Sequence, residues 1–204
     1  MKNNLLEEIT LSLMVPFVLM AFFRITSTEN TVHQPAHTTY RAKAVLGAGS
    51  VWQITEDYEI RFSTRGAEGS LRNLRGNIQF NEPHLNEAKF DVAVEVATIS
   101  TGNKKKDEHA RGKKWLDAAS FPEIKFISSA FEKQEEAFLV TGTLEIRGIR
   151  KEVTFPFQFS RDENKGLFEG RLTINREDFK IDGPMMAFMV GNKVEIELKV
   201  PVIQ

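Results

Sequence analysis

From Val51 onward, apolar residues recur at every second position, and this period of two constrains the fold more than any other feature of the sequence. The clearest run places Phe90, Val92, Val94 and Val96 on one face of an extended segment. Successive side chains of a strand point to opposite faces of a sheet, so this run predicts a strand with one dry and one wet face. The other runs with this pattern contain Ile60 and Phe62, Ile78 and Phe80, Ile124 and Phe126, Phe138 to Ile146, Val153 to Phe159, Phe168 to Ile174, and Val194 to Val202.

Turn residues separate these runs, as at Arg65-Gly66, Asn81-Glu82-Pro83, Gly148 and Gly191-Asn192. Eight or so strands joined mostly by short turns form an antiparallel meander, which must close on itself or pair with a second sheet. We therefore predict an all-β fold, an extended eight-stranded antiparallel barrel, with a two-sheet sandwich as the alternative that periodicity leaves open.

The stretch from Thr101 to Pro122 interrupts the pattern. Its charged first half and the apolar pair Trp115-Leu116 predict a short helical crossover at about residues 104–118. Such a segment is expected to cover one end of the sheet structure. A sharper interpretation is that its basic residues hold an anionic group such as phosphate. They are Lys104, Lys105, Arg111, Lys113 and Lys114.

Residues 1–50 do not show this alternation. Ile9 to Phe23 is a mostly apolar run that would measure roughly 22 Å as a helix, shorter than the roughly 30 Å bilayer core. We interpret residues 1–25 as a signal peptide or N-terminal membrane anchor, residues 26–50 as a linker and residues 51–204 as the barrel domain. The expected location is the periplasm or the exterior of the cell. Membrane contact through residues 9–23 would follow if the segment is uncleaved.

Composition removes several classes of function. The net charge of -1 gives no global attraction to nucleic acid, and the absence of cysteine excludes disulfides and thiolate chemistry. His33 and His37 have helical spacing but no nearby third ligand, so no metal site is expected. Neither a nucleophile elbow nor a Gly-rich phosphate loop is present, and we expect a protein that is not an enzyme.

The predicted interior suits a lipid chain. An eight-stranded barrel is just wide enough to be filled by side chains or to hold one slender ligand. Sixteen phenylalanines against two tryptophans and two tyrosines favour a dry interior, because phenylalanine has no polar group that needs a partner. Such a space would take a lipid rather than a sugar or a nucleotide.

Four segments resemble motifs of the YceI-like family, lipocalin-like proteins described as polyisoprenoid binding. They match the family in order along residues 51–202. They are Thr101-Gly102-Asn103 with Asp107 and His109, Phe121-Pro122-x-Ile124-x-Phe126-x-Ser128, Gly142-x-Leu144-x-Ile146-Arg147-Gly148-Ile149-x-Lys151, and Arg176-x-Asp178-Phe179-x-Ile181.

The resemblance implies a lipocalin-type barrel with a helix across one end, an apolar cavity, export, and a long isoprenoid or quinone-type lipid as ligand. No cofactor other than this lipid is expected. With the alternation, it makes these residues candidates for the cavity wall: Ile60, Phe62, Ile78, Phe80, Phe90, Val92, Val94, Phe126, Val140, Leu144, Phe155, Phe157, Phe168, Leu172, Met186 and Phe188.

Four residues are candidates for a headgroup or lid role: Lys106, Asp107, His109 and Trp115. A structural alternative is that Asp107 caps the start of the helix. The sequence departs from the family pattern at Lys106, Ala110 and Lys180, where arginine, leucine and glycine are usual, and at Thr64-Arg65, where many members have histidine. These departures put the headgroup preference, not the fold, in question.

The sequence is compatible with two functions. The first is an exported protein that holds a long apolar lipid for sequestration or transport. The second is a non-enzymatic envelope stress or interaction protein whose barrel is filled by its own side chains and holds no lipid. A homodimer is left open.

Overall fold

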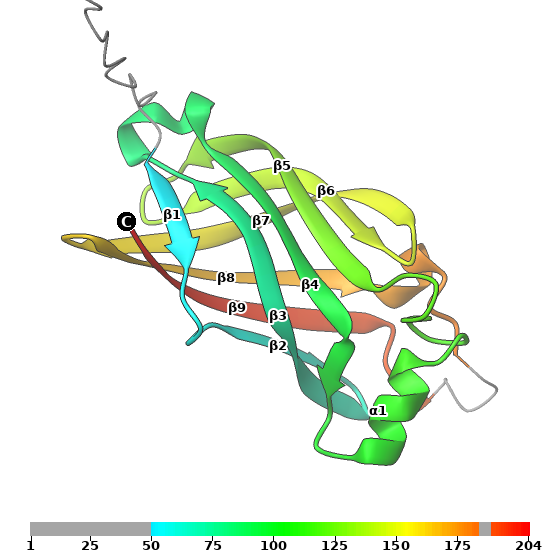
Figure 1. The fold of residues 1–204 in the computed structure, drawn as a ribbon. Coiled ribbons are helices and arrows are strands. Elements are labelled where there is room, and N and C mark those ends of the chain that lie inside the picture. The colour runs from blue at the N-terminus through cyan, green and yellow to red at the C-terminus, as the bar shows by residue number, and fades with distance from the viewer. Residues whose placement is uncertain (1–49, 184–188) are drawn as a thin grey trace, which may run out of the picture. The chain divides into compact units, whose positions relative to one another are not determined.

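The computed structural model describes residues 50–183 and 189–204, and over these residues the chain is a closed antiparallel barrel (Figure 1). The predicted signal peptide or anchor and almost all of the linker lie outside the described residues. No helix in the described part has the length and apolar character needed to cross a bilayer.

Nine strands, one α-helix and two 3-10 helices make up this part of the chain. In order they are β1 (Val51–Ile54), β2 (Glu59–Thr64), β3 (Ala67–Gln79), η1 (Glu82–Glu87), β4 (Lys89–Ser100), α1 (Lys104–Arg111), β5 (Glu123–Lys133), β6 (Phe138–Ile146), β7 (Ile149–Asp162), β8 (Lys165–Asn175), η2 (Arg176–Phe179) and β9 (Lys193–Ile203).

Closure runs through β2, β9, β8, β7, β6, β5, β4 and β3, and the pairing of β3 with both β2 and β4 completes the ring. The short β1 also lies between β3 and β9, farther along the barrel than β2. The segments β1 and β2 therefore act as one strand position interrupted by a turn. The prediction of an eight-stranded antiparallel barrel is confirmed, and the sandwich alternative is wrong.

Helix α1 lies at the end of the barrel opposite to β1 (Figure 1). Its N-cap is Asn103, whose side chain accepts hydrogen bonds from the backbone N–H groups of Lys105 and Lys106. Arg111 near its C-terminus donates to the carbonyl oxygens of Ala97 and Ile99 on β4. Isolated helices this short are marginal in water, so such contacts are needed to hold α1 in place. The predicted helical crossover is confirmed, but the helix ends at Arg111 and the rest of the predicted range, residues 112–118, forms turns.

The barrel wall is incomplete between β7 and β8. These strands pair only from Phe157↔Gly170 to Asp162↔Lys165, although β7 begins at Ile149 and β8 continues to Asn175. The ladder stops beside Pro156, which has no backbone N–H to contribute. Over residues 149–155, β7 is paired with β6 alone, and η2 lies close to it.

Candidate functional site

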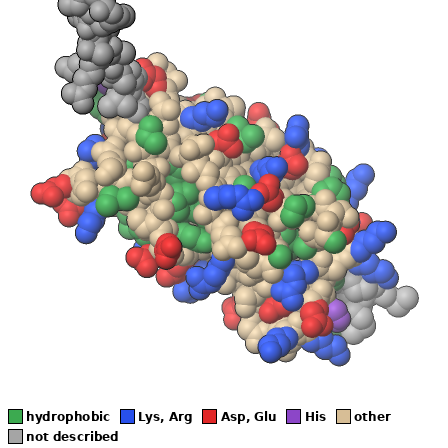
Figure 2. Space-filling view, in the orientation of Figure 1, with side chains coloured by type: hydrophobic (Ala, Val, Ile, Leu, Met, Phe, Trp, Pro, Cys, Tyr) green, Lys and Arg blue, Asp and Glu red, His purple; other side chains and the backbone are tan. Residues whose placement is uncertain are grey.

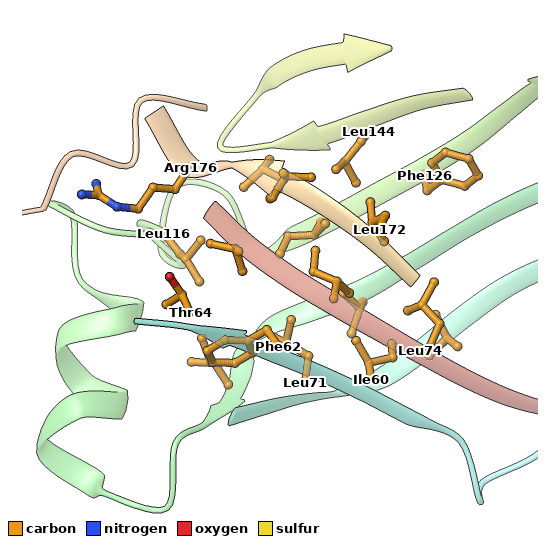
Figure 3. Close-up of a pocket in the computed structure, with 18 of the residues that line it drawn as sticks. Ile60, Phe62, Thr64, Leu71, Leu74, Leu116, Phe126, Leu144, Leu172 and Arg176 are labelled. Atoms are coloured by element: carbon orange, nitrogen blue, oxygen red, sulfur yellow. The ribbon is translucent and has the colours of Figure 1, made fainter. Parts of the chain in front are cut away.

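A cavity of about 570 Å³ occupies the interior of the barrel in the half nearer α1. Its wall comes from the inward side chains of β2 to β9, and Leu116 and Trp115 of the crossover contribute at the end. Figure 3 shows Phe62 of β2, Leu71 and Leu74 of β3, and Leu172 of β8 projecting into this space. The lining is almost entirely aliphatic or aromatic, as the alternation predicts.

Most of the cavity residues predicted from the sequence lie on this wall. They are Ile60, Phe62, Ile78, Phe90, Val92, Val94, Phe126, Leu144, Phe155, Phe157, Phe168 and Leu172. Phe80 and Val140 face inward but lie in the packed core beyond the cavity, with exposures of 1% and 0%. Met186 and Phe188 lie outside the described residues.

Aromatic side chains fill the end of the barrel opposite to α1. Phe80 lies at the centre of this aromatic plug, with ring centroids 5.1 Å from those of Phe138 and Phe159 and 5.4 Å from that of Phe168. Trp52 of β1 donates from Nε1 to the Phe80 carbonyl oxygen at 2.9 Å. The remaining rings of the plug are Phe90, Phe131 and Phe157. The barrel is thus filled at one end and hollow at the other.

Two residues of the cavity wall do not follow strict alternation along their strand. Leu71 and Leu74 both line the cavity, although they are separated by an odd number of positions. Between them Asn73 adopts a φ of 58° and the pairing of β3 with β4 shifts in register. Such a bulge inserts a residue and returns the next side chain to the same face. In the sequence, an asparagine between Arg72 and Leu74 is a weak signal for this.

The crossover places polar side chains at the mouth of the cavity. Lys106, His109 and Trp115 line it, as do Thr64 and Thr101 from the ends of β2 and β4. Three of the four predicted headgroup or lid residues are therefore brought together.

Asp107 has a different place from the other three. It is buried and accepts hydrogen bonds from the backbone N–H and the Oγ1 of Thr101, at 2.7 and 2.6 Å. The Thr101 side chain, then its backbone N–H, lowers the pKa of Asp107 below its ordinary value, and the Arg111 charge acts in the same direction. The cap of α1 is Asn103, so the expectation that Asp107 caps the helix is wrong. Asp107 instead ties α1 to the end of β4.

Two arginines join the segments that surround the mouth. Arg176 is 6% exposed and donates to the carbonyl oxygens of Gly191 and Ile181, and its guanidinium lies 5.8 Å from the Trp115 ring centroid. Its side chain reaches past the apolar wall toward the adjoining loops (Figure 3). Both arginines belong to family-like motifs, but the sequence did not place Arg176 on the cavity wall.

Arg147 donates to the carbonyl oxygens of Lys180, after η2, and Lys113, after α1. Gly183 N–H donates to the Lys114 carbonyl oxygen at 3.0 Å. These hydrogen bonds to backbone carbonyl oxygens join the crossover to the segment that follows η2.

The arrangement is suited to binding an apolar molecule. Residues 50–183 and 189–204 contain no group of three His, Asp or Glu side chains that could hold a metal ion. The cavity volume falls in the range of about 300–1,000 Å³ typical of small-molecule sites. An apolar wall with a few polar groups at one end can bury a tail and leave a polar head near solvent.

The sequence matches a family model and several curated relatives. Residues 33–202 match the model of the YceI-like domain. A UPF0312 protein of Pseudomonas savastanoi is 29% identical over 123 residues, which are 57% of this chain and 64% of the relative. A UPF0312 protein of Yersinia pestis is 28% identical over 145 residues, 67% of this chain and 73% of the relative. The chain thus spans somewhat less than two thirds of the first of these relatives.

Solved structures share the fold. Burkholderia cenocepacia BcnA superposes with a TM-score of 0.70 at 22% identity, covering 73% of this chain and 99% of that protein. The Campylobacter jejuni YceI protein gives 0.61 at 23% identity, covering 68% and 85%. A polyisoprenoid-binding domain from Saccharophagus degradans, implicated in plant cell wall breakdown, gives 0.55 at 10% identity, covering 77% and 95%.

Proposed function

Because the chain belongs to the YceI-like family, we propose that it is a non-enzymatic protein that holds one long apolar lipid in its barrel for sequestration or transport. The single observation that carries this proposal is the cavity of about 570 Å³ with an apolar wall and a polar mouth. The filled-barrel alternative lacks this support, because only the end with the aromatic plug is filled.

Desolvation supplies the affinity. Each CH₂ group that leaves water for an apolar site contributes about 0.8 kcal/mol, so the tail of a long lipid provides most of the binding free energy. Lys106, His109 and Thr64 at the mouth then select the head through hydrogen bonds or charge. The tail points toward the aromatic plug, because the polar side chains of the lining gather at the other end.

An isoprenoid or quinone-type lipid is the ligand class that we favour. A branched, unsaturated chain fits a narrow interior built from phenylalanine, leucine, isoleucine and valine. The description of the Saccharophagus degradans neighbour as polyisoprenoid binding supports the same class. We also propose that the protein acts in the periplasm or outside the cell, which rests on residues 1–25 as a signal peptide or anchor.

The test is a binding titration with matched variants on β9. Ile196 lines the cavity, whereas its neighbour Glu195 is on the outer face. The full chain, Ile196→Trp and Glu195→Trp are titrated with a fluorescent long-chain probe, dansyl-undecanoic acid, and then with geranylgeraniol or a short-chain ubiquinone as competitor. Wild type and Glu195→Trp are expected to bind alike. Ile196→Trp is expected to bind at least about tenfold more weakly, since its indole occupies space that the tail needs.

Equal binding by the two tryptophan variants would contradict a site inside the barrel. Wild-type protein that takes up neither the probe nor the competitors would contradict the function itself. Native mass spectrometry of detergent-free protein, with solvent extraction, then identifies any lipid that co-purifies. An isoprenoid mass at stoichiometric amount would establish the ligand class.

A further inference from the structure

The position of the basic residues around the cavity mouth points to an interaction surface that the proposed function does not itself require. We propose that the end of the barrel carrying α1 docks on an anionic lipid bilayer, with the cavity mouth facing the bilayer surface. The inference rests on the proposed function for its purpose, since docking would let a lipid pass between bilayer and cavity. Its physical basis is the distribution of charge, which is independent of the ligand.

The crossover supplies most of the positive charge. Six of the eleven residues from Lys104 to Lys114 are lysine or arginine, and two are acidic. Lys104, Lys105 and Lys113 are exposed, and none forms an ion pair with another described residue. One of the two acidic residues, Asp107, is buried against Thr101 and presents little charge outward. The exposed face of the crossover is therefore strongly basic.

The end of the barrel that carries the cavity mouth also has charged side chains outside the crossover. Exposed acidic side chains there are Glu68, Glu108, Glu177, Asp178 and Asp182, and exposed basic side chains beyond the crossover are Arg65, Lys180 and Lys193. Glu177 accepts a hydrogen bond from Asn192. Figure 2 shows basic side chains gathered around this end with acidic ones among them. The balance stays positive because the crossover outweighs the acidic side chains of η2 and its neighbour.

The opposite end of the barrel carries the reverse charge. Its loops and strand ends contain six acidic residues, Glu82, Glu87, Glu135, Glu136, Asp162 and Glu163, against four basic ones, Lys89, Lys133, Arg161 and Lys165. The net charge of the whole chain is only -1, so the asymmetry between the ends would orient the molecule without attracting it strongly as a whole. A negatively charged bilayer selects the mouth end, and the aromatic plug then faces away from it.

Apolar groups continue from the cavity to the surface at the same end. Met189 is 56% exposed, and the adjacent Val190 lines the cavity. An exposed methionine beside a basic rim can enter the headgroup region once lysines have brought the surfaces together. A lipid tail that moves through such a contact avoids exposure to water, which is the costly step in its transfer.

The experiment measures adsorption of the full chain to vesicles of phosphatidylcholine, with and without 30% phosphatidylglycerol, by co-sedimentation. The mouth variant Lys104→Gln/Lys105→Gln/Lys113→Gln is compared with the control variant Lys89→Gln/Lys133→Gln/Lys165→Gln, which removes the same charge near the plugged end. None of the six lysines lines the cavity. Each lysine near an anionic surface contributes about fivefold to partitioning, so the mouth variant should lose about 100-fold and the control variant little.

A second measurement locates the contact without altering these lysines. The chain contains no cysteine, so Met189→Cys and Glu135→Cys can each be labelled at one site with an environment-sensitive fluorophore. Only the label at position 189 is expected to shift to the blue on phosphatidylglycerol vesicles, and the shift should disappear in 0.5 M salt.

An equal loss of adsorption to anionic vesicles in the two triple variants would overturn the proposal. A blue shift of the label at position 135 alone would overturn it too, since the opposite end would then face the bilayer. Any contribution of residues 9–23 is common to the two triple variants and does not affect the comparison between them. Probe titration of the mouth variant in the absence of vesicles tests the cavity separately, so docking can fail while the proposed function stands.

Discussion

At the scale of single residues, Lys180 has a backbone conformation that its side chain does not favour. It follows η2 with φ 51° and ψ 39°, in the left-handed region that suits glycine. Glycine is also what the resemblance to the YceI-like family leads us to expect here. The N–H of Lys180 donates to the carbonyl oxygens of Arg176 and Glu177, so the backbone geometry is held in spite of the strain.

Lys180→Gly is therefore expected to raise the free energy of unfolding by about 0.5–1 kcal/mol, since the steric cost of a β-carbon is removed. Urea denaturation followed by circular dichroism measures the change. Lys180→Ala is the control, because it removes the same charged chain but keeps the β-carbon. A glycine variant no more stable than the alanine variant would show that the left-handed conformation carries no strain.

Asp107 provides a second prediction at this scale, concerning pH. Its pKa is lowered mainly by the two hydrogen bonds from Thr101, so the charged form stabilises the folded state. A lowered carboxyl pKa contributes stability that is complete above the ordinary value of 3.8 and is lost as the pH falls through the lowered value. Asp107→Asn should therefore be less stable than wild type at pH 7.

The difference between the Asp107→Asn and wild-type unfolding free energies should be constant from pH 7 to about pH 5 and shrink below the ordinary pKa. Thermal unfolding at a series of pH values measures it. Glu108→Gln, which removes an exposed neighbouring carboxylate, is the control. A difference that grows toward acid pH would mean that Asp107 does not hold Thr101 through its charged form.

At the scale of the elements, the unpaired edges of β7 and β8 distinguish one part of the wall from the rest. Alternate backbone N–H groups of residues 149–155 point away from β6 and meet no partner strand. We expect about half of these amides to exchange with deuterium much faster than those of β9, which is paired on both sides. Hydrogen exchange with mass spectrometry of peptides from residues 149–155 and 193–203 makes the comparison. Equal protection would show that the wall is closed in solution.

Elements with regular alternation are the ones that could be predicted. The eight apolar runs of the sequence correspond to β2 through β9, and Gly148 marks the tight turn between β6 and β7, where Arg147 and Gly148 both have positive φ. The short β1 was missed because four residues are too few to show a period. Leu71 and Leu74 were missed because the bulge at Asn73 breaks the period while leaving both side chains inside.

At the scale of the whole molecule, the barrel and most of its inward-facing residues could be predicted, but the division of its interior could not. Alternation predicts which side chains point into the barrel. It does not predict whether the inward side chains of opposite walls fill the interior or leave a cavity. Phe80 and Phe126 have equivalent places in their sequence patterns, yet the first is buried among rings and the second faces open space. That difference depends on which rings oppose each other around the closed wall, which only the three-dimensional register supplies.

The aromatic plug also determines how a ligand can enter and leave the barrel. A barrel open at both ends could contact a donor at one end and an acceptor at the other, and a ligand could pass straight through it. With one end packed by rings, the carrier proposed above would load and unload at the end that carries α1, so a donor and an acceptor would compete for the same face. For the proposed lipid carrier, exchange would then follow ping-pong kinetics, because the protein would have to leave one partner before it meets the next.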